Sequence, residues 1–253
     1  MSLERLREHR QIWAAKPVLR EVYGVWFRAI LAHAAAGARV VEIGAGPGLF
    51  REWARTHRPD LRWVATDLLP ASWNDVAADA TALPLRPACV DLVLGIDVLH
   101  HLADPRALFA EAARVTVATG RLVLVEPWIT PLSYPIYRLA HQEGCSLGVD
   151  PWRPFGSGSS KDAFEGDQAI PWKIVRSTSD VEWHGLGLDR PAVTTLNGFG
   201  CLSTLGFRRA SLLPRRMAGP LLWCDRLLAP LSRWAGLRAL IAWERRRGGV
   251  PAR

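Results

Sequence analysis

Hydrophobic positions in the first part of the chain follow the period of an α-helix. Apolar residues of the segment 17–35 recur at intervals of three or four, and the pattern ends near Gly37. Side chains spaced in this way share one face of a helix, and glycine commonly follows a helix end. We therefore expect helices over 3–15 and 17–35, which together form an N-terminal helical cap over residues 1–37.

From residue 38 onward, the hydrophobic period changes from that of helices to that of buried strands. Short runs rich in Val, Leu and Ile are separated by turn residues and by helical patterns. The expected strands are 38–44, 61–67, 76–80, 90–97 and 121–127, and the expected helices between them are 49–56 and 105–117. Strands that alternate with helices predict a doubly wound α/β domain with a mostly parallel sheet. Ligands of such domains bind at the carboxyl ends of the strands.

The pattern becomes less regular after the last of these strands. Residues 128–180 are rich in proline, tryptophan, glycine and serine, so we expect an insertion or lid there rather than core. The segment 181–211 is expected to supply the last strands of the domain, which then extends over 38–211. Beyond it, leucine and tryptophan alternate with arginine, and we expect a basic amphipathic helical tail over 212–253, interrupted by prolines.

Composition narrows the class of protein. The chain has 253 residues, of which 49% are hydrophobic and 22% charged, as is typical of globular proteins. No apolar stretch has the roughly 18 residues of a membrane span, and the charged N-terminus lacks the apolar core of a secretory signal. We therefore expect a cytoplasmic protein. The four cysteines are widely spaced and predict neither a disulfide framework nor a zinc site, and no metal site is predicted.

Most of the net charge of +8 belongs to the C-terminal segment. Eleven arginines between Arg208 and Arg253 stand against Asp225 and Glu244, while the rest of the chain is nearly neutral. A basic segment that carries tryptophans is compatible with nucleic acid, an anionic membrane surface or solvent as its surroundings.

A glycine-rich segment follows the first expected strand, with the sequence Glu42-Ile-Gly44-Ala-Gly46-Pro-Gly48. Glycines allow the backbone to turn tightly and to approach a ligand without a Cβ in the way. The spacing does not fit the dinucleotide motif G-x-G-x-x-G, because Leu49 stands where the third glycine is required. It does not fit the phosphate-binding P-loop either, because no lysine follows Gly48. What remains is an acidic residue followed by three alternating glycines.

This pattern resembles the first signature motif of the class I S-adenosylmethionine-dependent methyltransferases, especially the branch that contains the ubiquinone and menaquinone biosynthesis methyltransferases. The resemblance continues in register over about 38–127, because Asp67 ends the second expected strand and Asp79 precedes a Leu-Pro pair. It implies a Rossmann-like methyltransferase domain over 38–211 and S-adenosylmethionine as the cofactor.

The resemblance also implies which residues bind the cofactor. In the family, the acidic residue at the end of the second strand binds the ribose hydroxyls, and an Asp-Ala pair contacts the adenine amino group. Residues at the end of the fourth strand approach the methionine part. Carried over to this chain, the cofactor-binding residues are Glu42, Gly44, Ala45, Gly46, Gly48, Asp67, Leu68, Asp79, Ala80, Ile96 and Asp97.

Two histidines are the candidates for acid–base chemistry. Methyl transfer from a sulfonium is an in-line displacement, so the protein mainly binds and aligns the reactants. A hydroxyl acceptor, or a carbon acceptor that reacts as an enolate, also needs a base. We expect this base to be His101, after the fourth strand, or His141, in the insertion. In the alternative interpretation, His100 and His101 cap and pack the start of the next helix.

The acceptor is expected to be small or hydrophobic. The tryptophans in and near the insertion suit an apolar acceptor pocket, and they are Trp128, Trp152, Trp172 and Trp183. Those of the expected tail lie among leucines and arginines, as in helices at membrane surfaces, and they are Trp223, Trp234 and Trp243. Together they suggest a lipid-linked acceptor met at the inner face of the membrane. Alternatively, the tail packs on the domain or on a dimer partner, and the oligomeric state stays open.

Two other functions remain as alternatives. A nucleic-acid methyltransferase would use the basic tail, but residues 96–99 read Ile-Asp-Val-Leu and lack the N/D-P-P-Y/F motif of enzymes that methylate the amino groups of bases. A nucleic-acid partner is therefore not expected. The third alternative is a non-catalytic protein that keeps the cofactor fold.

Overall fold

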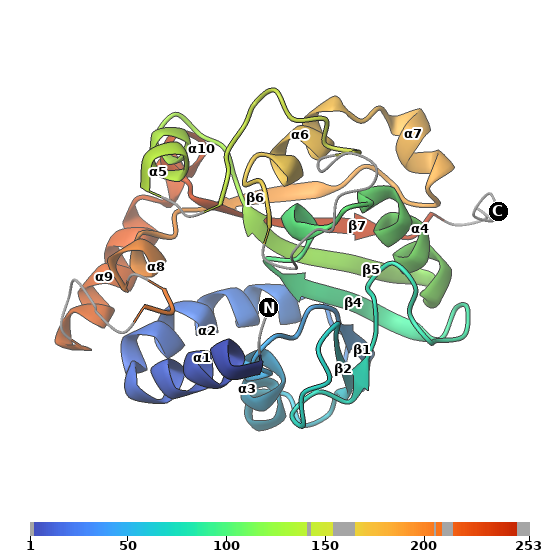
Figure 1. Ribbon diagram of the computed structural model, residues 1–253, viewed down its shortest axis with the longest axis horizontal. Coiled ribbons are helices and arrows are strands. Elements are labelled where there is room, and N and C mark those ends of the chain that lie inside the picture. Colours follow the sequence, from blue (N-terminus) through green and yellow to red (C-terminus); the bar gives the residue numbers. More distant parts are fainter. Residues whose placement is uncertain (1–2, 141–142, 154–164, 205, 209–214, 247–253) are drawn as a thin grey trace.

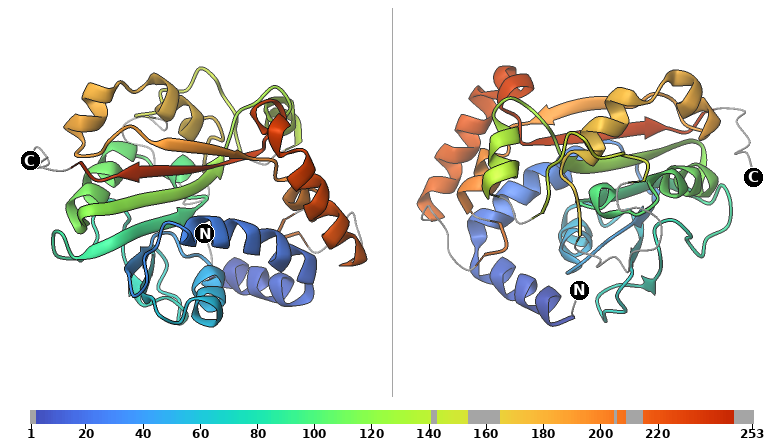
Figure 2. Two further views of the ribbon diagram at one scale, coloured as in Figure 1. Left: turned by 180° about the vertical axis from the view of Figure 1, so that it is seen from behind. Right: turned by 45° about the horizontal axis from the view of Figure 1, so that its top comes forward.

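A computed structural model describes residues 3–140, 143–153, 165–204, 206–208 and 215–246 of the chain. In this part of the chain, seven strands form one sheet in the order β3-β2-β1-β4-β5-β7-β6 (Figures 1 and 2). The strands are β1 Arg39–Glu42, β2 Arg62–Asp67, β3 Val76–Ala77, β4 Val90–Ile96, β5 Thr116–Pro127, β6 Ala192–Leu196 and β7 Arg238–Glu244. Strands β1 to β5 pair in parallel, and β7 pairs antiparallel with both β5 and β6.

Helices cover both faces of the sheet. They are α1 Leu3–Ala15, α2 Pro17–Leu31, α3 Leu49–His57, α4 Pro105–Val115, α5 Ser133–Ala140, α6 Ile170–Ser177, α7 Asp180–Gly185, α8 Phe199–Thr204, α9 Ala218–Leu227 and α10 Ser232–Ala235. The short 3-10 helices are η1 Leu99–His101, η2 Arg215–Met217 and η3 Ala229–Leu231. In Figure 1, α1, α2 and α3 lie below the sheet, and α6 and α7 lie above it.

Side chains of the central strands alternate between two hydrophobic cores. Val40 and Val123 pack with residues of α2 and α3, whereas Val41 and Leu124 pack with residues of α4, α6 and α7. Successive side chains of a strand point to opposite faces, so a strand covered on both faces is apolar almost throughout. This is the pattern that predicted the doubly wound, mostly parallel sheet with N-terminal helices, and the structure confirms it.

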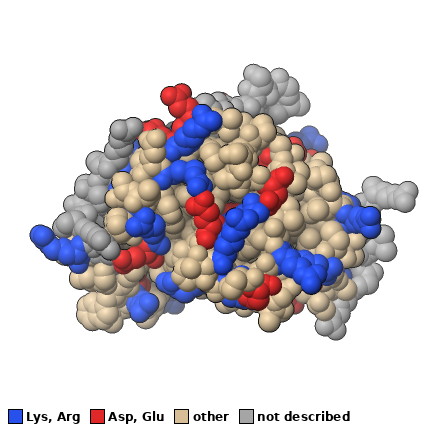
Figure 3. Space-filling view, turned by 90° about the horizontal axis from the view of Figure 1, so that it is seen from below, with Lys and Arg blue, Asp and Glu red and all other residues tan. Residues whose placement is uncertain are grey.

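The face covered by α1, α2 and α3 carries side chains of both charges. Figure 3 shows basic and acidic side chains interspersed on it rather than one continuous basic surface. Ion pairs around α3 account for part of this pattern, with 2.6 Å between Arg51 and Asp75 and 2.8 Å between Arg58 and Asp60.

The expected helical tail over 212–253 is wrong in its last described part. Its helices end at Ala235, and residues 238–244 form β7, which lies in the sheet between β5 and β6. A strand with neighbours on both sides and helices on both faces is apolar along its whole length, and such a run has no period that separates it from a buried helix. Trp243 is fully buried and packs against Phe109, with 5.1 Å between ring centroids. It therefore belongs to the core and not to a membrane-facing surface.

The segment between β5 and β7 also differs from expectation. The start of the segment 181–211, expected to supply the last strands, belongs to helix α7, which Ser179 and Glu182 begin with a capping box. The strand of this region is β6, and it is followed by helix α8. Within the expected insertion 128–180, helix α6 is core rather than lid, since its Ile170 and Ile174 are fully buried.

The placement of the C-terminal tryptophans predicts a large loss of stability on substitution of Trp243 and almost none on substitution of Trp234. Trp243→Ala removes a buried ring from the sheet and should cost about 3–5 kcal/mol in the free energy of unfolding. Trp234→Ala, at a side chain that is 56% exposed on α10, should change it by about 0.5 kcal/mol or less. Urea unfolding of both variants measures the difference, and equal costs would contradict the placement of β7 in the sheet.

Candidate active site

The glycine-rich loop connects β1 to α3 along a path that requires glycine. Gly44, Gly46 and Gly48 have φ angles of 58°, 51° and 71°, in the left-handed region. A Cβ at Gly44 would lie 2.6 Å from a methyl carbon of Val98, and one at Gly48 would lie 2.7 Å from Trp73. The loop therefore keeps its conformation only without side chains at these positions.

Asp67, at the end of β2, is linked to this loop by a hydrogen bond. Its Oδ2 accepts from the Gly46 amide at 2.8 Å, and its Oδ1 accepts from the Leu69 amide at 2.9 Å. Each carboxylate oxygen can accept more than one hydrogen bond, so both keep capacity for ligand hydroxyls. Leu68 is 58% exposed, and its side chain is available for contact with a ligand.

Glu42 lies in a buried position at the end of β1. Its carboxyl oxygen Oε2 accepts a hydrogen bond of 3.0 Å from the indole N–H of Trp63. Burial raises the pKa of Glu42 to about 8, although the Trp63 hydrogen bond and the charge of Arg51 act in the opposite direction. Near neutral pH, Glu42 is therefore mainly a protonated acid.

The remaining cofactor candidates follow β3 and β4. The Asp79 carboxylate accepts from the backbone amide and the hydroxyl of Thr81, at 2.8 and 2.7 Å, and Ala80 beside it is buried. Ile96 ends β4, and Asp97 follows with a φ of 58°, which is unusual for a residue other than glycine. The strands β3, β2, β1 and β4 are parallel neighbours in the sheet. The candidate cofactor segments therefore all lie near the carboxyl ends of these strands.

Three contacts of this region were not predicted. Arg238 of β7 forms an ion pair with Asp97, although sequence analysis assigned it to the tail. Arg10 of α1 donates to the Pro47 carbonyl at 2.7 Å, and the Trp73 indole donates to the Gly46 carbonyl at 2.8 Å. These residues are far from the loop in sequence or lie outside any periodic motif, so no sequence signal was available to find them.

His100 is buried and lies between two carboxylates. Its Nδ1 donates to Glu126 Oε2 at 2.7 Å, and its Nε2 lies 3.2 Å from Glu143 Oε2. Burial by itself lowers the pKa of His100, but the hydrogen bond and charge of Glu126, together with Glu143, raise it to about 9. His100 is therefore a packed residue that also carries a charge, because its ring is positively charged near neutral pH.

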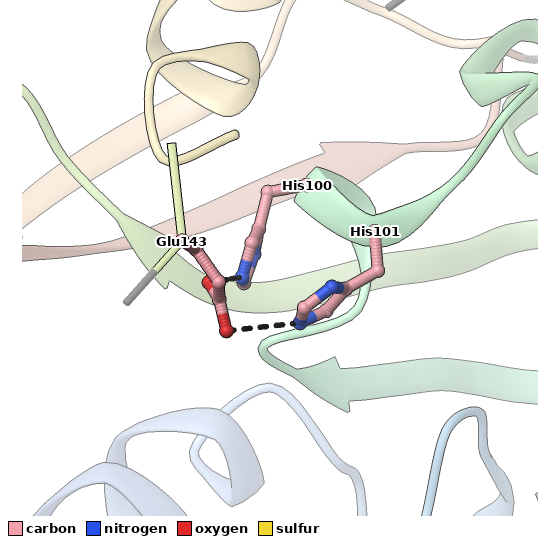
Figure 4. Close-up of side chains that lie close together, drawn as sticks. All are labelled: His100, His101 and Glu143. Atoms are coloured by element: carbon pink, nitrogen blue, oxygen red, sulfur yellow. Dashed lines mark hydrogen bonds and ion pairs between the residues drawn. The ribbon is translucent and has the colours of Figure 1, made fainter. Parts of the chain in front are cut away.

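His101 faces the same carboxylate. Its Nδ1 donates to the Glu165 carbonyl at 3.2 Å, and its Nε2 lies 3.9 Å from Glu143 Oε1 (Figure 4). Burial, and after it the positive charge of His100, lower the pKa of His101. We call His100, His101 and Glu143 the histidine–glutamate cluster. His141, the other candidate base, lies outside the described residues.

The tryptophans expected to line an acceptor pocket have different positions. Trp183 is fully buried, and its ring packs against Phe109 and Trp243, so it belongs to the core rather than to a pocket. Trp152 and Trp172 are partly buried against the same core. Trp128 is 8% exposed and directly follows β5.

Known proteins show the same domain. A family model described as a methyltransferase domain matches residues 41–124. A malonyl-[acyl-carrier protein] O-methyltransferase of Hahella chejuensis is 35% identical over 96 residues, which cover 33% of this chain and 34% of that protein. An uncharacterized methyltransferase of Mycobacterium sp. (strain JLS) is 29% identical over 154 residues, which cover 54% of this chain and 60% of that protein. The chain thus spans between about a third and three fifths of the curated relatives it matches.

Among solved structures, a SAM-dependent methyltransferase from Archaeoglobus fulgidus superimposes with a TM-score of 0.53 at 16% identity, covering 89% of this chain and 94% of that one. This likeness confirms the Rossmann-like fold. The match over 41–124 identifies this segment as a methyltransferase domain, and it supports the resemblance to class I methyltransferases of the type 11 kind that use S-adenosylmethionine. The side-chain-free glycine loop and the acceptor oxygens of Asp67 beside it fit this cofactor.

The raised pKa of Glu42 predicts a pH-dependent contribution to stability. The folded state holds the Glu42 proton up to about pH 8, whereas the unfolded chain releases it near its ordinary value of 4.5. Stability from this group is therefore complete below about pH 4.5 and falls as pH rises toward 8, by at most about 1.4 kcal/mol per pH unit. Glu42→Gln should remove this decline, so the variant should gain on the wild type between pH 5 and 8 in urea unfolding. Parallel pH profiles of the two proteins would contradict a buried, protonated Glu42.

Proposed function

We propose that the chain transfers a methyl group from S-adenosylmethionine to an oxygen or carbon atom of a small or hydrophobic acceptor. The observation that carries the proposal is the arrangement at the carboxyl edge of the sheet. The glycine loop and Asp67 stand at the ends of β1 and β2, and the histidine–glutamate cluster begins just after β4. A cofactor site and a proton-accepting site thus lie on neighbouring strands, as a transfer between two bound molecules requires.

The residues have separate roles in this proposal. The sulfonium of the cofactor supplies the activated methyl group, so the chain's own task is to bind, align and accept a proton. Donation of the His101 Nδ1 proton to the Glu165 carbonyl leaves Nε2 as an acceptor, turned toward Glu143. For a hydroxyl acceptor, His101 Nε2 takes the proton as the new O–C bond forms and the S–C bond breaks, and S-adenosylhomocysteine leaves. The nearby Glu143 carboxylate stabilises the resulting imidazolium.

An oxygen acceptor has support from one relative, which is a malonyl-[acyl-carrier protein] O-methyltransferase. A carbon acceptor that reacts as an enolate would use the same base. The nucleic-acid alternative loses support, because two arginines of the expected tail are engaged within the domain. Arg238 pairs with Asp97, and Arg245 donates to the Thr116 carbonyl.

In addition to the acceptor, we propose a membrane surface as a partner of the protein. Over the segment from α9 to α10, the exposed large apolar side chains are Trp223, Leu227, Leu228, Leu231 and Trp234. The exposed Arg226 and Arg233 lie among them, a composition that favours an anionic lipid surface. Among the described residues, no helix combines the length and apolar character needed to cross a membrane.

Transfer of a labelled methyl group tests the function. The wild type should bind S-adenosylmethionine and label acceptors from a panel of carrier-bound acyl groups, free acids, phenols and quinols. Asp67→Ala should weaken cofactor binding at least about tenfold, because charge-assisted hydrogen bonds are worth roughly 1.5–3 kcal/mol. His101→Gln should keep cofactor binding but lose about 10²–10⁴ in kcat toward a hydroxyl acceptor.

Asp180→Ala and His184→Gln are the matched controls for this assay, because both side chains are exposed and lie on α7. They should leave binding and transfer unchanged. A folded wild type that binds no S-adenosylmethionine would overturn the proposed function. An unchanged kcat in His101→Gln would remove His101 as the base.

Flotation with vesicles that contain phosphatidylglycerol tests the membrane contact. The double variant Trp223→Ser/Trp234→Ser should lose most of the vesicle-bound fraction seen for the wild type, because both rings are exposed beside arginines. Leu139→Ser/Val181→Ser, at side chains that are 82% and 79% exposed elsewhere, is the control and should float as the wild type does. Equal flotation of both variants, or none by the wild type, would contradict the contact.

A further inference from the structure

We propose that the histidine–glutamate cluster binds a divalent transition-metal ion of the Zn²⁺ kind. Its side chains offer two imidazole nitrogens and one carboxylate, and the ligand atoms lie within 4.8 Å of one another. Two histidines and one carboxylate form the protein ligand set of many catalytic zinc sites and of non-haem iron sites. Figure 4 shows both rings and the Glu143 carboxylate turned toward one another.

The distances between the ligand atoms suit one ion. His100 Nε2 lies 3.2 Å from Glu143 Oε2, and His101 Nε2 lies 3.9 Å from Glu143 Oε1. Ligands held about 2.0–2.1 Å from a tetrahedral ion are roughly 3.3 Å apart. Small side-chain rotations are therefore sufficient to bring the three atoms into coordination, without movement of the strands.

Each ligand is held from behind by a second group. The Nδ1 atom of His100 donates to Glu126, the Nδ1 atom of His101 donates to the Glu165 carbonyl, and the Gln168 amide donates to Glu143. These bonds fix both rings with Nε2 directed into the cluster. Outer hydrogen bonds of this kind, and the carboxylate–histidine pair above all, orient the ligands of protein metal sites.

The cluster brings electron-pair donors close together. A carboxylate oxygen and an imidazole nitrogen 3.2 Å apart both offer an electron pair, so a proton or a metal ion must lie between them. A bound metal ion would take the place of that proton between His100 and Glu143.

The site is accessible from one side. His100 is nearly inaccessible, but the side chains of His101 and Glu143 are 17% and 23% exposed. An ion held by three protein ligands keeps at least one position open for water or for an acceptor atom. That position would lie on the exposed side of the cluster.

The chemical role of the ion rests on the proposed function, whereas its binding does not. A divalent ion held by the cluster would lower the pKa of a coordinated acceptor hydroxyl, whose proton would pass to water. The acceptor oxygen would form the O–C bond as the S–C bond of the cofactor breaks, with no change in the oxidation state of the ion. With the ion bound, His101 would be a ligand and not the base.

Metal titration of the full chain tests the site without any acceptor. After chelator treatment, the protein should bind one Zn²⁺ per chain in calorimetry, and Co²⁺ should give a visible absorption band of a nitrogen–oxygen site. Glu143→Gln and His101→Gln should each weaken Zn²⁺ binding at least about tenfold and abolish the Co²⁺ band, since even outer-sphere changes cost 10–100-fold.

His184→Gln is the matched control, because His184 also faces a carboxylate, with its Nε2 3.6 Å from Asp189 Oδ1. This variant should bind Zn²⁺ as the wild type does. Titration with S-adenosylmethionine in the same samples separates the two proposals, since the cluster variants should retain cofactor binding. Absence of Zn²⁺ binding by the wild type, or equal affinity in the cluster variants and the control, would show that the cluster holds only a proton and would overturn the metal site.

Discussion

The carboxylate of Glu126 joins the carboxyl ends of β4 and β5. Its Oε1 accepts the amide protons of Val98 and Leu99, each at 2.8 Å, and its Oε2 accepts from His100 Nδ1. Because Glu126 is fully buried, loss of these donors would leave an uncompensated charge inside the protein. One side chain thus fixes both the turn after β4 and the ring of His100. The position of His100 therefore follows from the register of two neighbouring parallel strands.

Asp97, the first residue after β4, is held in an unfavourable backbone conformation at the same edge. A left-handed conformation outside glycine costs on the order of 1 kcal/mol or more, so the surrounding structure must stabilise it. The Asp97 amide donates to the Val125 carbonyl of β5 at 3.0 Å, and its carboxylate pairs with Arg238 of β7. The antiparallel strand β7 therefore contributes more than core packing, since it anchors Asp97, a candidate cofactor residue that precedes the cluster in the chain.

Local features in the sequence predicted where the candidate cofactor residues lie, at the ends of strands. The glycine spacing, Asp67 and Asp79 each stand at the end of an apolar run, and a parallel sheet brings such ends to one edge. By contrast, β7 escaped detection because a buried apolar run fits a helix as well as a strand. The approach of Glu143 to His100 escaped as well, because it joins residues 43 positions apart through a segment without periodicity. The catalytic role of His101 stays a prediction.

The family model covers one part of the candidate site and not the other. The family model covers residues 41–124, which include the glycine loop, Asp67 and both histidines of the cluster. Glu143, the Glu165 carbonyl and Gln168, which complete the cluster, come from the segment after β5 and lie outside that match. The glycine loop, Asp67 and the two histidines thus lie within the family match, whereas the groups that complete the proposed acceptor side of the site come from a part of this chain that the family model does not describe. The choice of acceptor must therefore be derived from the chemistry of these residues rather than transferred from a relative.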